Sequence, residues 1–266
     1  MCSRFLVEGI PMTARFITAL VSCVLLVGAS GYVLADDEVF QRCGTPGLIE
    51  RMAQGAHKIA GGRLDILAKS AISSGGHFRV HYDATGYNAP DPADGDINGI
   101  PDYIDSTLVY LEYAWHLEID ILGFKAPSDD NGAGGGDEID VYVRNFGSSG
   151  YGITYPETQA DKSVSGYMQI DNDYKESQYS AKGYAALRVT TAHEFLHVIQ
   201  FSYKIDSTVL IWWMEHSATW MEERAWDDVN DYIAYLKNFY LYQNKYPIDH
   251  ISYGDNFMYG AVVWPI

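Results

Sequence analysis

Two histidines and a glutamate lie at a spacing that can build a catalytic metal site. His193 and His197 are four residues apart in the stretch His-Glu-Phe-Leu-His, so on a helix with 3.6 residues per turn they project from one face. Two imidazole nitrogens can then bind one ion. Glu194 lies about 100° further round the same helix, where a carboxylate can take a proton from a water molecule beside the ion. The spacing predicts a zinc hydrolase with Glu194 as its general base.

The surrounding residues predict that this stretch is a buried helix. Apolar residues recur every three or four positions over 185–201, and no glycine or proline interrupts the run. A catalytic zinc usually has three protein ligands and one open position, so a third ligand is expected further along the chain. The next helical stretch contains Glu215 and His216, and Glu222 follows nearly two turns later.

These two stretches resemble those of known metallopeptidases. In the gluzincin class, the third zinc ligand is a glutamate on a helix that follows His-Glu-x-x-His, and Glu215 is the matching position. The chain is most similar to a family of predicted secreted bacterial metalloproteases of myxobacterial type, which shares the W-W-M-E-x-x-A-T-W-M-E stretch. The resemblance implies a zinc-dependent endopeptidase that acts on proteins or peptides. Its zinc ligands would be His193, His197 and Glu215, with His216 and Glu222 as alternatives for the third.

One position departs from the thermolysin-like branch of that class. That branch has an acidic residue four positions after the glutamate ligand, where it orients a histidine, and this chain has Thr219 there. Because an outer partner fixes the ring orientation of a metal-binding histidine, another residue must take this role. Hydrolysis also needs a donor that stabilises the oxyanion. The candidates are Tyr253, Tyr259 and His250, and the sequence does not choose among them.

The pattern of elements fits an α+β fold of zincin type. Periodicity predicts a strand over 77–82, an amphipathic helix over 103–122, and strands over 139–143 and 166–170 before the active-site helix. The resemblance implies a mixed, twisted sheet with a backing helix, and a mainly helical C-terminal part. It also implies that the last strand is the sheet edge that takes an extended substrate, which places the substrate along residues 167–171.

The ends of the chain suggest processing. A basic start, an apolar centre and small residues before Ala35 are typical of a secretory signal peptide cleaved after Ala35, and hence of an extracytoplasmic protein. We expect a signal peptide over 1–35, a helical leader or short prosegment over 36–72, and a metallopeptidase domain over 73–266. The chain ends on apolar residues without a polar tail, which is typical of a C-terminally truncated fragment. No other apolar run approaches the length of a membrane span.

Removal of the signal peptide would leave Cys43 as the one cysteine of the chain. It lies in Gln-Arg-Cys-Gly-Thr-Pro-Gly, residues 41–47, which resembles the cysteine-switch segment of matrix metalloproteases. In that family a prosegment thiolate takes the fourth zinc position. A thiolate is a strong zinc ligand that would displace the catalytic water. The resemblance therefore implies latency through Cys43, and an idle thiol in a turn is the alternative.

An acidic loop predicts a second metal ion. Its oxygen-bearing side chains occupy loop positions 1, 3, 5, 9 and 12, with a glycine at position 6, which follows the register of an EF-hand loop. No helix precedes the loop, and an acidic surface turn is the alternative to a calcium site. The net charge of −17 disfavours nucleic acids and anionic membranes as partners. The expected calcium ligands are Asp94, Asp96, Asn98, Asp102 and Asp105.

Three functions remain open from the sequence. The first is a secreted zinc endopeptidase. The second is a zinc hydrolase of a non-peptide ester or amide, which would share every catalytic residue. The third is a non-catalytic, calcium-dependent surface or adhesion module that keeps a structural metal. Glu194 favours the first two, because a purely structural site does not need a base.

Overall fold

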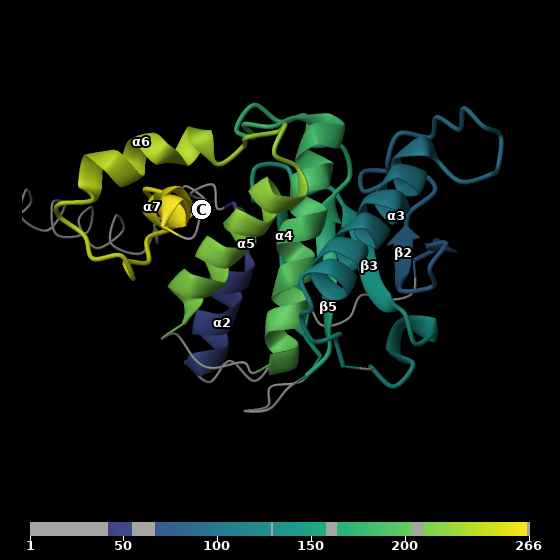
Figure 1. Ribbon diagram of the computed structural model, residues 1–266. Helices are drawn as coiled ribbons and strands as arrows, with labels where there is room; N and C mark the ends of the chain where they lie inside the picture. The colour runs from purple at the N-terminus through teal and green to yellow at the C-terminus, as the bar shows by residue number, and fades with distance from the viewer. Residues whose placement is uncertain (1–41, 55–66, 129, 158–163, 204–209, 265–266) are drawn as a thin grey trace, which may run out of the picture. The chain divides into compact units, whose positions relative to one another are not determined.

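The computed structural model describes residues 42–54, 67–128, 130–157, 164–203 and 210–264 (Figure 1). The expected signal peptide and the first part of the expected leader lie outside these residues. Among the helices that are described, none is both long enough and apolar enough to cross a membrane.

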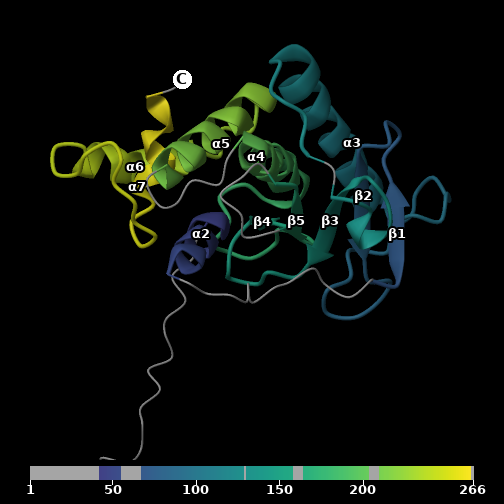
Figure 2. The same cartoon turned by 90° about the horizontal axis from the view of Figure 1, so that it is seen from below.

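Five strands form one mixed sheet in the order β1-β2-β3-β5-β4 (Figure 2). β2, β3 and β5 are parallel, whereas β1 and β4 add to them in the antiparallel sense. All residues of β4 and β5 are buried, so both faces of this part of the sheet are covered. The strands are β1 Lys69–Ile72, β2 Phe78–Tyr82, β3 Ile139–Arg144, β4 Gly152–Pro156 and β5 Gly166–Asp171.

The main apolar core lies between the sheet and the long helices α3 and α4 (Figure 1). In this core, Phe195 of α4 packs against Phe78 of β2 and Trp115 of α3, with ring centroids 5.1 and 5.7 Å apart. α3 continues directly into a π-helix, His116–Ile121. The helices are α2 Thr45–Ala53, α3 Asp102–Trp115, α4 Gly183–Tyr203, α5 Ile211–Ala225, α6 Ile233–Tyr242 and α7 Phe257–Gly260. The expected α+β class, mixed sheet and helical C-terminal part are confirmed.

Two expectations about the sheet are wrong. The strand at residues 167–171 is not an edge, because β5 pairs with β3 on one side and with β4 on the other. The edge next to it is β4, a short strand bounded by glycine and proline that gives a weak signal in the sequence. Residues 69–72 belong to the expected helical leader, yet they form the strand β1 and pair with β2.

The first described residues lie along β4. Cys43 pairs with Gly152 in a parallel bridge. The amide of Gly44 donates to the carbonyl of Gly152 at 2.9 Å, and the amide of Tyr151 donates to the carbonyl of Arg42 at 2.8 Å. We call residues 42–45 the strap. It adds to the sheet edge as one more short extended segment and then leads into α2.

Candidate metal centre

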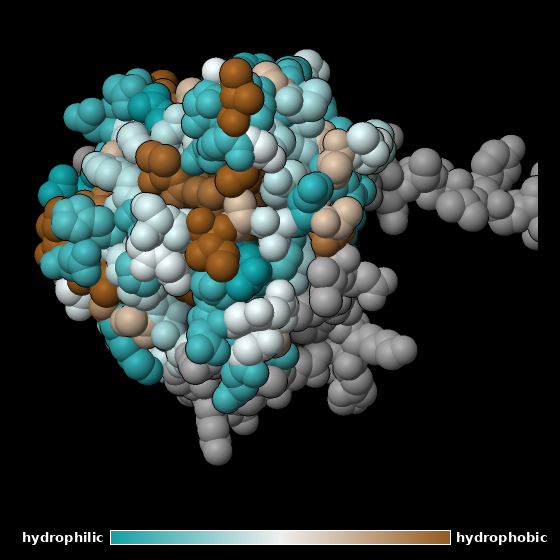
Figure 3. Space-filling model, turned by 90° about the vertical axis from the view of Figure 1, so that its right-hand side faces the viewer, coloured by the Kyte–Doolittle hydropathy of each residue, from teal (hydrophilic) through white to brown (hydrophobic). Residues whose placement is uncertain are grey.

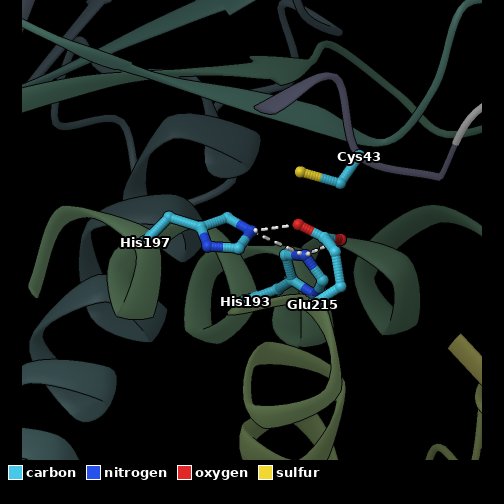
Figure 4. Close-up of side chains that lie close together, drawn as sticks. All are labelled: Cys43, His193, His197 and Glu215. Carbon is cyan, nitrogen blue, oxygen red and sulfur yellow. Dashed lines mark hydrogen bonds and ion pairs between the residues drawn. The ribbon is translucent and has the colours of Figure 1, made fainter. Parts of the chain in front are cut away.

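Three side chains from two helices converge on one point (Figure 4). His193 and His197 project from α4 with their Nε2 atoms 3.1 Å apart. Glu215 of α5 brings Oε1 to 3.0 Å from His197 Nε2 and Oε2 to 3.5 Å from His193 Nε2. Atoms that bind a tetrahedral zinc at about 2.0–2.1 Å lie roughly 3.3 Å apart. The three groups therefore fit the ligand set expected from the sequence.

The charges of the site fit a cation as well. Burial disfavours protonation of His193, but the neighbouring carboxylates of Glu215 and Glu222 outweigh it and raise its pKa to about 10. Burial also opposes ionisation of Glu215, yet His197 and His193 lower its pKa to about 2. Each of the three converging residues is at most 2% exposed. The pocket thus holds a buried carboxylate that needs a positive partner, which is either a proton on His193 or a metal ion.

The second ring nitrogen of each histidine is held by its own partner. Nδ1 of His193 lies 2.6 Å from Glu222 Oε1, and Nδ1 of His197 lies 2.7 Å from Gln200 Oε1. Gln200 is fixed in turn through its amide nitrogen, which donates to Ser217 Oγ at 3.0 Å. Such partners fix the ring orientation of metal-binding histidines. Glu222 therefore takes the orienting role that Thr219 cannot take, and it does not join the converging atoms.

His216, the other alternative for the third ligand, is also not one of the converging side chains. Neither ring nitrogen of His216 has a hydrogen-bond partner, and its ring packs edge-on against Trp212 with centroids 5.3 Å apart. Burial lowers the pKa of His216 to about 4, despite the opposing charge of Glu215. His216 is therefore a neutral, packed side chain.

Glu194 of α4 contacts the edge strand β4. Its Oε2 is 2.6 Å from the hydroxyl of Thr154. Gly152 leaves room for it, because a Cβ at this position would come within 2.9 Å of Glu194 Cγ. Glu194 is 1% exposed. Glu194 thus follows His193 in the chain and contacts a strand at the sheet edge, which makes it a candidate general base.

Cys43 reaches the same point from the strap. Its Sγ and one ligand atom from each of His193, His197 and Glu215 all lie within 4.8 Å of one another. Figure 4 shows the sulfur pointing towards the histidine and carboxylate groups from the side opposite α4 and α5. Burial raises the pKa of the thiol well above its usual value, and the charges of Glu194 and Glu215 add to this. Without a metal, Cys43 is a neutral thiol.

The three candidate oxyanion donors differ in their contacts. The hydroxyl of Tyr259 accepts a hydrogen bond from the amide of Cys43 at 3.2 Å, and burial together with the charge of Glu215 raises its pKa. Burial also raises the pKa of Tyr253, mainly with the charge of Glu50. His250 instead stacks on Tyr246 with centroids 3.8 Å apart. Tyr259 is thus the candidate with a hydrogen bond to the strap, whereas Tyr253 packs against the apolar cluster that contains Cys43 and Tyr259.

The acidic loop also brings oxygen atoms together. Carboxylate oxygens of Asp94, Asp96 and Asp102 lie within 4.8 Å of one another. The side-chain amide of Asn98 donates to Asp96 Oδ2 at 3.1 Å and to Asp105 Oδ2 at 3.0 Å. The five residues expected to bind calcium therefore form one connected group, with three carboxylates at its centre.

A large apolar hollow lies apart from these groups. It is an apolar cavity of about 620 Å³ between α4 and α5, lined among others by Phe124, Trp213 and Trp220. None of the converging side chains lines it, so it is not the metal centre. On the face of the molecule seen in Figure 3, hydrophilic residues cover most of the surface and apolar residues gather near its centre.

Comparison with known proteins adds no assignment, because a scan against protein-family models and a search of curated proteins both find no match. The site therefore rests on its own geometry. Sequence reasoning missed Thr154, Gln200 and Arg42, whose roles appear only through contacts with residues of other elements or turns. Of these, only Gln200 had a possible signal, since it lies three residues after His197 on the same helix.

Proposed function

We propose that this protein is a secreted zinc-dependent endopeptidase of gluzincin type with a zincin-like fold. The observation that carries the proposal is the convergence of His193, His197 and Glu215, whose facing atoms are 3.0–3.5 Å apart. This spacing matches a tetrahedral zinc site. The mixed sheet beneath the ligand helix supports the zincin-like fold, and the signal-like N-terminus supports export.

The residues around the proposed zinc ligands have separate roles in the proposed hydrolysis. Zinc, when bound, polarises the scissile carbonyl and lowers the pKa of water. Glu194 accepts a proton from the attacking water on its carboxylate and passes it to the leaving amine. Thr154 holds that carboxylate through its hydroxyl, 2.6 Å from Oε2. Tyr259 is the side chain best placed to donate a hydrogen bond to the oxyanion, since its hydroxyl lies next to the main chain of Cys43.

The edge strand β4 favours a peptide over a small ester or amide as the substrate. It offers its main-chain groups beside Glu194, and the strap already pairs with it through Gly44 and Gly152. An extended peptide can pair with an exposed strand edge in the same way. We infer that substrates lie along β4.

The strap also supports latency. It covers the edge where a substrate would pair, and it carries Cys43 to the fourth side of the metal centre. A thiolate at that position excludes water from the metal. Activation then requires that the strap leave β4, and loss of the thiolate as a metal ligand favours this step.

Peptide hydrolysis by three zinc-loaded proteins tests this function. We expect low activity in the parent and several-fold higher activity in Cys43→Ser. Adding Glu194→Gln to Cys43→Ser should lower the activity of that variant by roughly 10²–10⁴-fold, which is the usual contribution of general acid–base catalysis. Zinc content should stay the same in all three. Full activity in the doubly substituted protein would contradict the role of Glu194.

We further propose that the acidic loop binds calcium. Three carboxylates and an amide oxygen within one short loop are hard ligands of the kind that calcium prefers. The grouping of Asp94, Asp96 and Asp102 within 4.8 Å supports this assignment.

A further inference from the structure

The strap places a second side chain, Arg42, in a buried acidic site. We call this site the cage, and it is formed by Glu222, Asp231, Tyr151 and Tyr235. Its guanidinium donates to Glu222 Oε2 and to Asp231 Oδ2. The rings of Tyr151 and Tyr235 flank it, with their centroids 4.9 and 5.0 Å from the guanidinium carbon. Two carboxylates and two aromatic faces are the groups that recognise a guanidinium best.

The cage is held in place by groups that are independent of Arg42. Asp231 accepts a hydrogen bond from the amide of Ala181 at 2.7 Å and from the hydroxyl of Tyr151 at 3.2 Å. Glu222 is held by Nδ1 of His193 at 2.6 Å. The cage therefore has the construction of a preformed binding site.

The cage needs a cation. Arg42, Glu222 and Asp231 are each at most 5% exposed. Burial disfavours the charged form of Arg42, but the charges of Asp231 and Glu222 raise its pKa well above the usual value. If the strap leaves β4, as activation requires, two buried carboxylates lose the guanidinium that neutralises them, which is strongly unfavourable. A positive group that enters in place of Arg42 removes this cost.

The strap also shows how a substrate would reach the cage. Arg42 is adjacent in the chain to Cys43, whose sulfur faces the metal centre, and the main chain of both residues lies along the edge of β4. A peptide paired with the same edge carries one side chain at the metal centre and the next at the cage.

We propose that the cage formed by Glu222, Asp231, Tyr151 and Tyr235 is a substrate subsite for a basic side chain, arginine above lysine, next to the scissile bond, and that Arg42 occupies it as an internal substitute for the substrate. This inference rests on the proposed endopeptidase function, because only an endopeptidase places a substrate side chain next to a scissile bond. The binding of a guanidinium by the cage does not depend on that function.

The first test measures binding without turnover. We would follow thermal unfolding of the full chain carrying Arg42→Ala, and separately the near-isosteric Arg42→Gln in case the first variant does not fold. Ethylguanidinium at millimolar concentration should raise the unfolding midpoint of these variants by several degrees, ethylammonium by less and neutral ethylurea not at all. The parent should not respond, and Asp231→Asn added to either variant should abolish the effect. Equal responses to all three compounds would overturn the proposal.

The second test measures selectivity. The zinc-loaded Arg42→Gln protein is given peptides that differ at a single position, with arginine, lysine, norleucine or glutamate there, and each position is tested in turn. We expect at least a tenfold preference for arginine over norleucine at one position, lost when Asp231→Asn is added. Cleavage without such a preference would overturn the subsite and leave the endopeptidase function intact. Binding of ethylguanidinium without cleavage of any peptide would support the cage as a guanidinium-binding site and contradict the endopeptidase function.

Discussion

His216 follows the proposed ligand Glu215 in the chain, but its surroundings suit a different residue type. Both of its ring nitrogens are buried without hydrogen-bond partners, and its ring packs against Trp212. A buried polar atom without a partner costs about 1–3 kcal/mol. An apolar ring of similar size would fill the same space without this cost.

His216 should make the protein sensitive to acid. Its pKa is about 4 in the folded protein and about 6.5 in an unfolded chain. Between these values the unfolded chain binds the extra proton, so the free energy of unfolding falls as the pH falls through this window, by about 3 kcal/mol in total. We expect His216→Phe to lose less stability than the parent between pH 7 and pH 4, in urea unfolding with metals chelated. Identical pH dependence in the two proteins would contradict this.

The facing histidine pair could be predicted from the sequence because its geometry is local. Positions i and i+4 of a helix face the same way whatever the rest of the fold does. The partner that replaces the missing acidic residue at Thr219 could not be predicted, because Glu222 is a helix-face residue in the sequence and becomes a partner of His193 only when α5 packs on α4.

At the scale of elements, the proposed substrate position depends on β4, which is the edge strand next to β5. The five residues of β4 begin with glycine and end with proline, two residue types that are depleted in strands and therefore weaken its signal in the sequence. Its position beyond β5 follows from long-range pairing, which a single sequence does not reveal. The expected edge at residues 167–171 was wrong for this reason.

Gly152 should be necessary for activity and not for metal binding. A Cβ there would lie 2.9 Å from Glu194 Cγ and 3.1 Å from the carbonyl oxygen of Gln169. Because Glu194 must move, Gly152→Ala in the Cys43→Ser background should lower peptide hydrolysis by about 10²-fold, the usual effect of a small displacement of a catalytic group. Zinc content should not change.

Gly254 provides the matched control, since a Cβ there meets no atom within 4 Å. Gly254→Ala should keep both activity and zinc. If both glycine variants retained full activity, the placement of Glu194 against β4 would be wrong.

At the scale of the whole molecule, a net charge of −17 works against compactness, and the proposed zinc and calcium ions would offset part of it. The strap adds a second long-range constraint. Arg42 contacts Glu222 and Asp231, which lie 180 and 189 residues further along the chain. Contacts at such separations depend on the complete fold, so the sequence could suggest a role for Cys43 but not the cage that holds its neighbour.

Calcium should stabilise the folded chain through the acidic loop. A ligand that binds only the folded state at about 100 times its Kd adds about 3 kcal/mol, which is several degrees in the unfolding midpoint. We expect calcium to raise the midpoint of the parent, with a much smaller rise in Asp96→Asn. Asp120→Asn, which alters an exposed aspartate on the π-helix, should behave like the parent. An equal rise in all three proteins would place calcium elsewhere.

The central claim is that His193, His197 and Glu215 bind one zinc ion. Its most direct test is the zinc content of the purified full chain by elemental mass spectrometry, beside His193→Ala, Glu215→Ala and the control His216→Phe, with folding checked by circular dichroism. We predict about one zinc per chain in the parent and the control, and a large loss in the two ligand variants. A folded parent without zinc, or ligand variants that keep it, would contradict the claim.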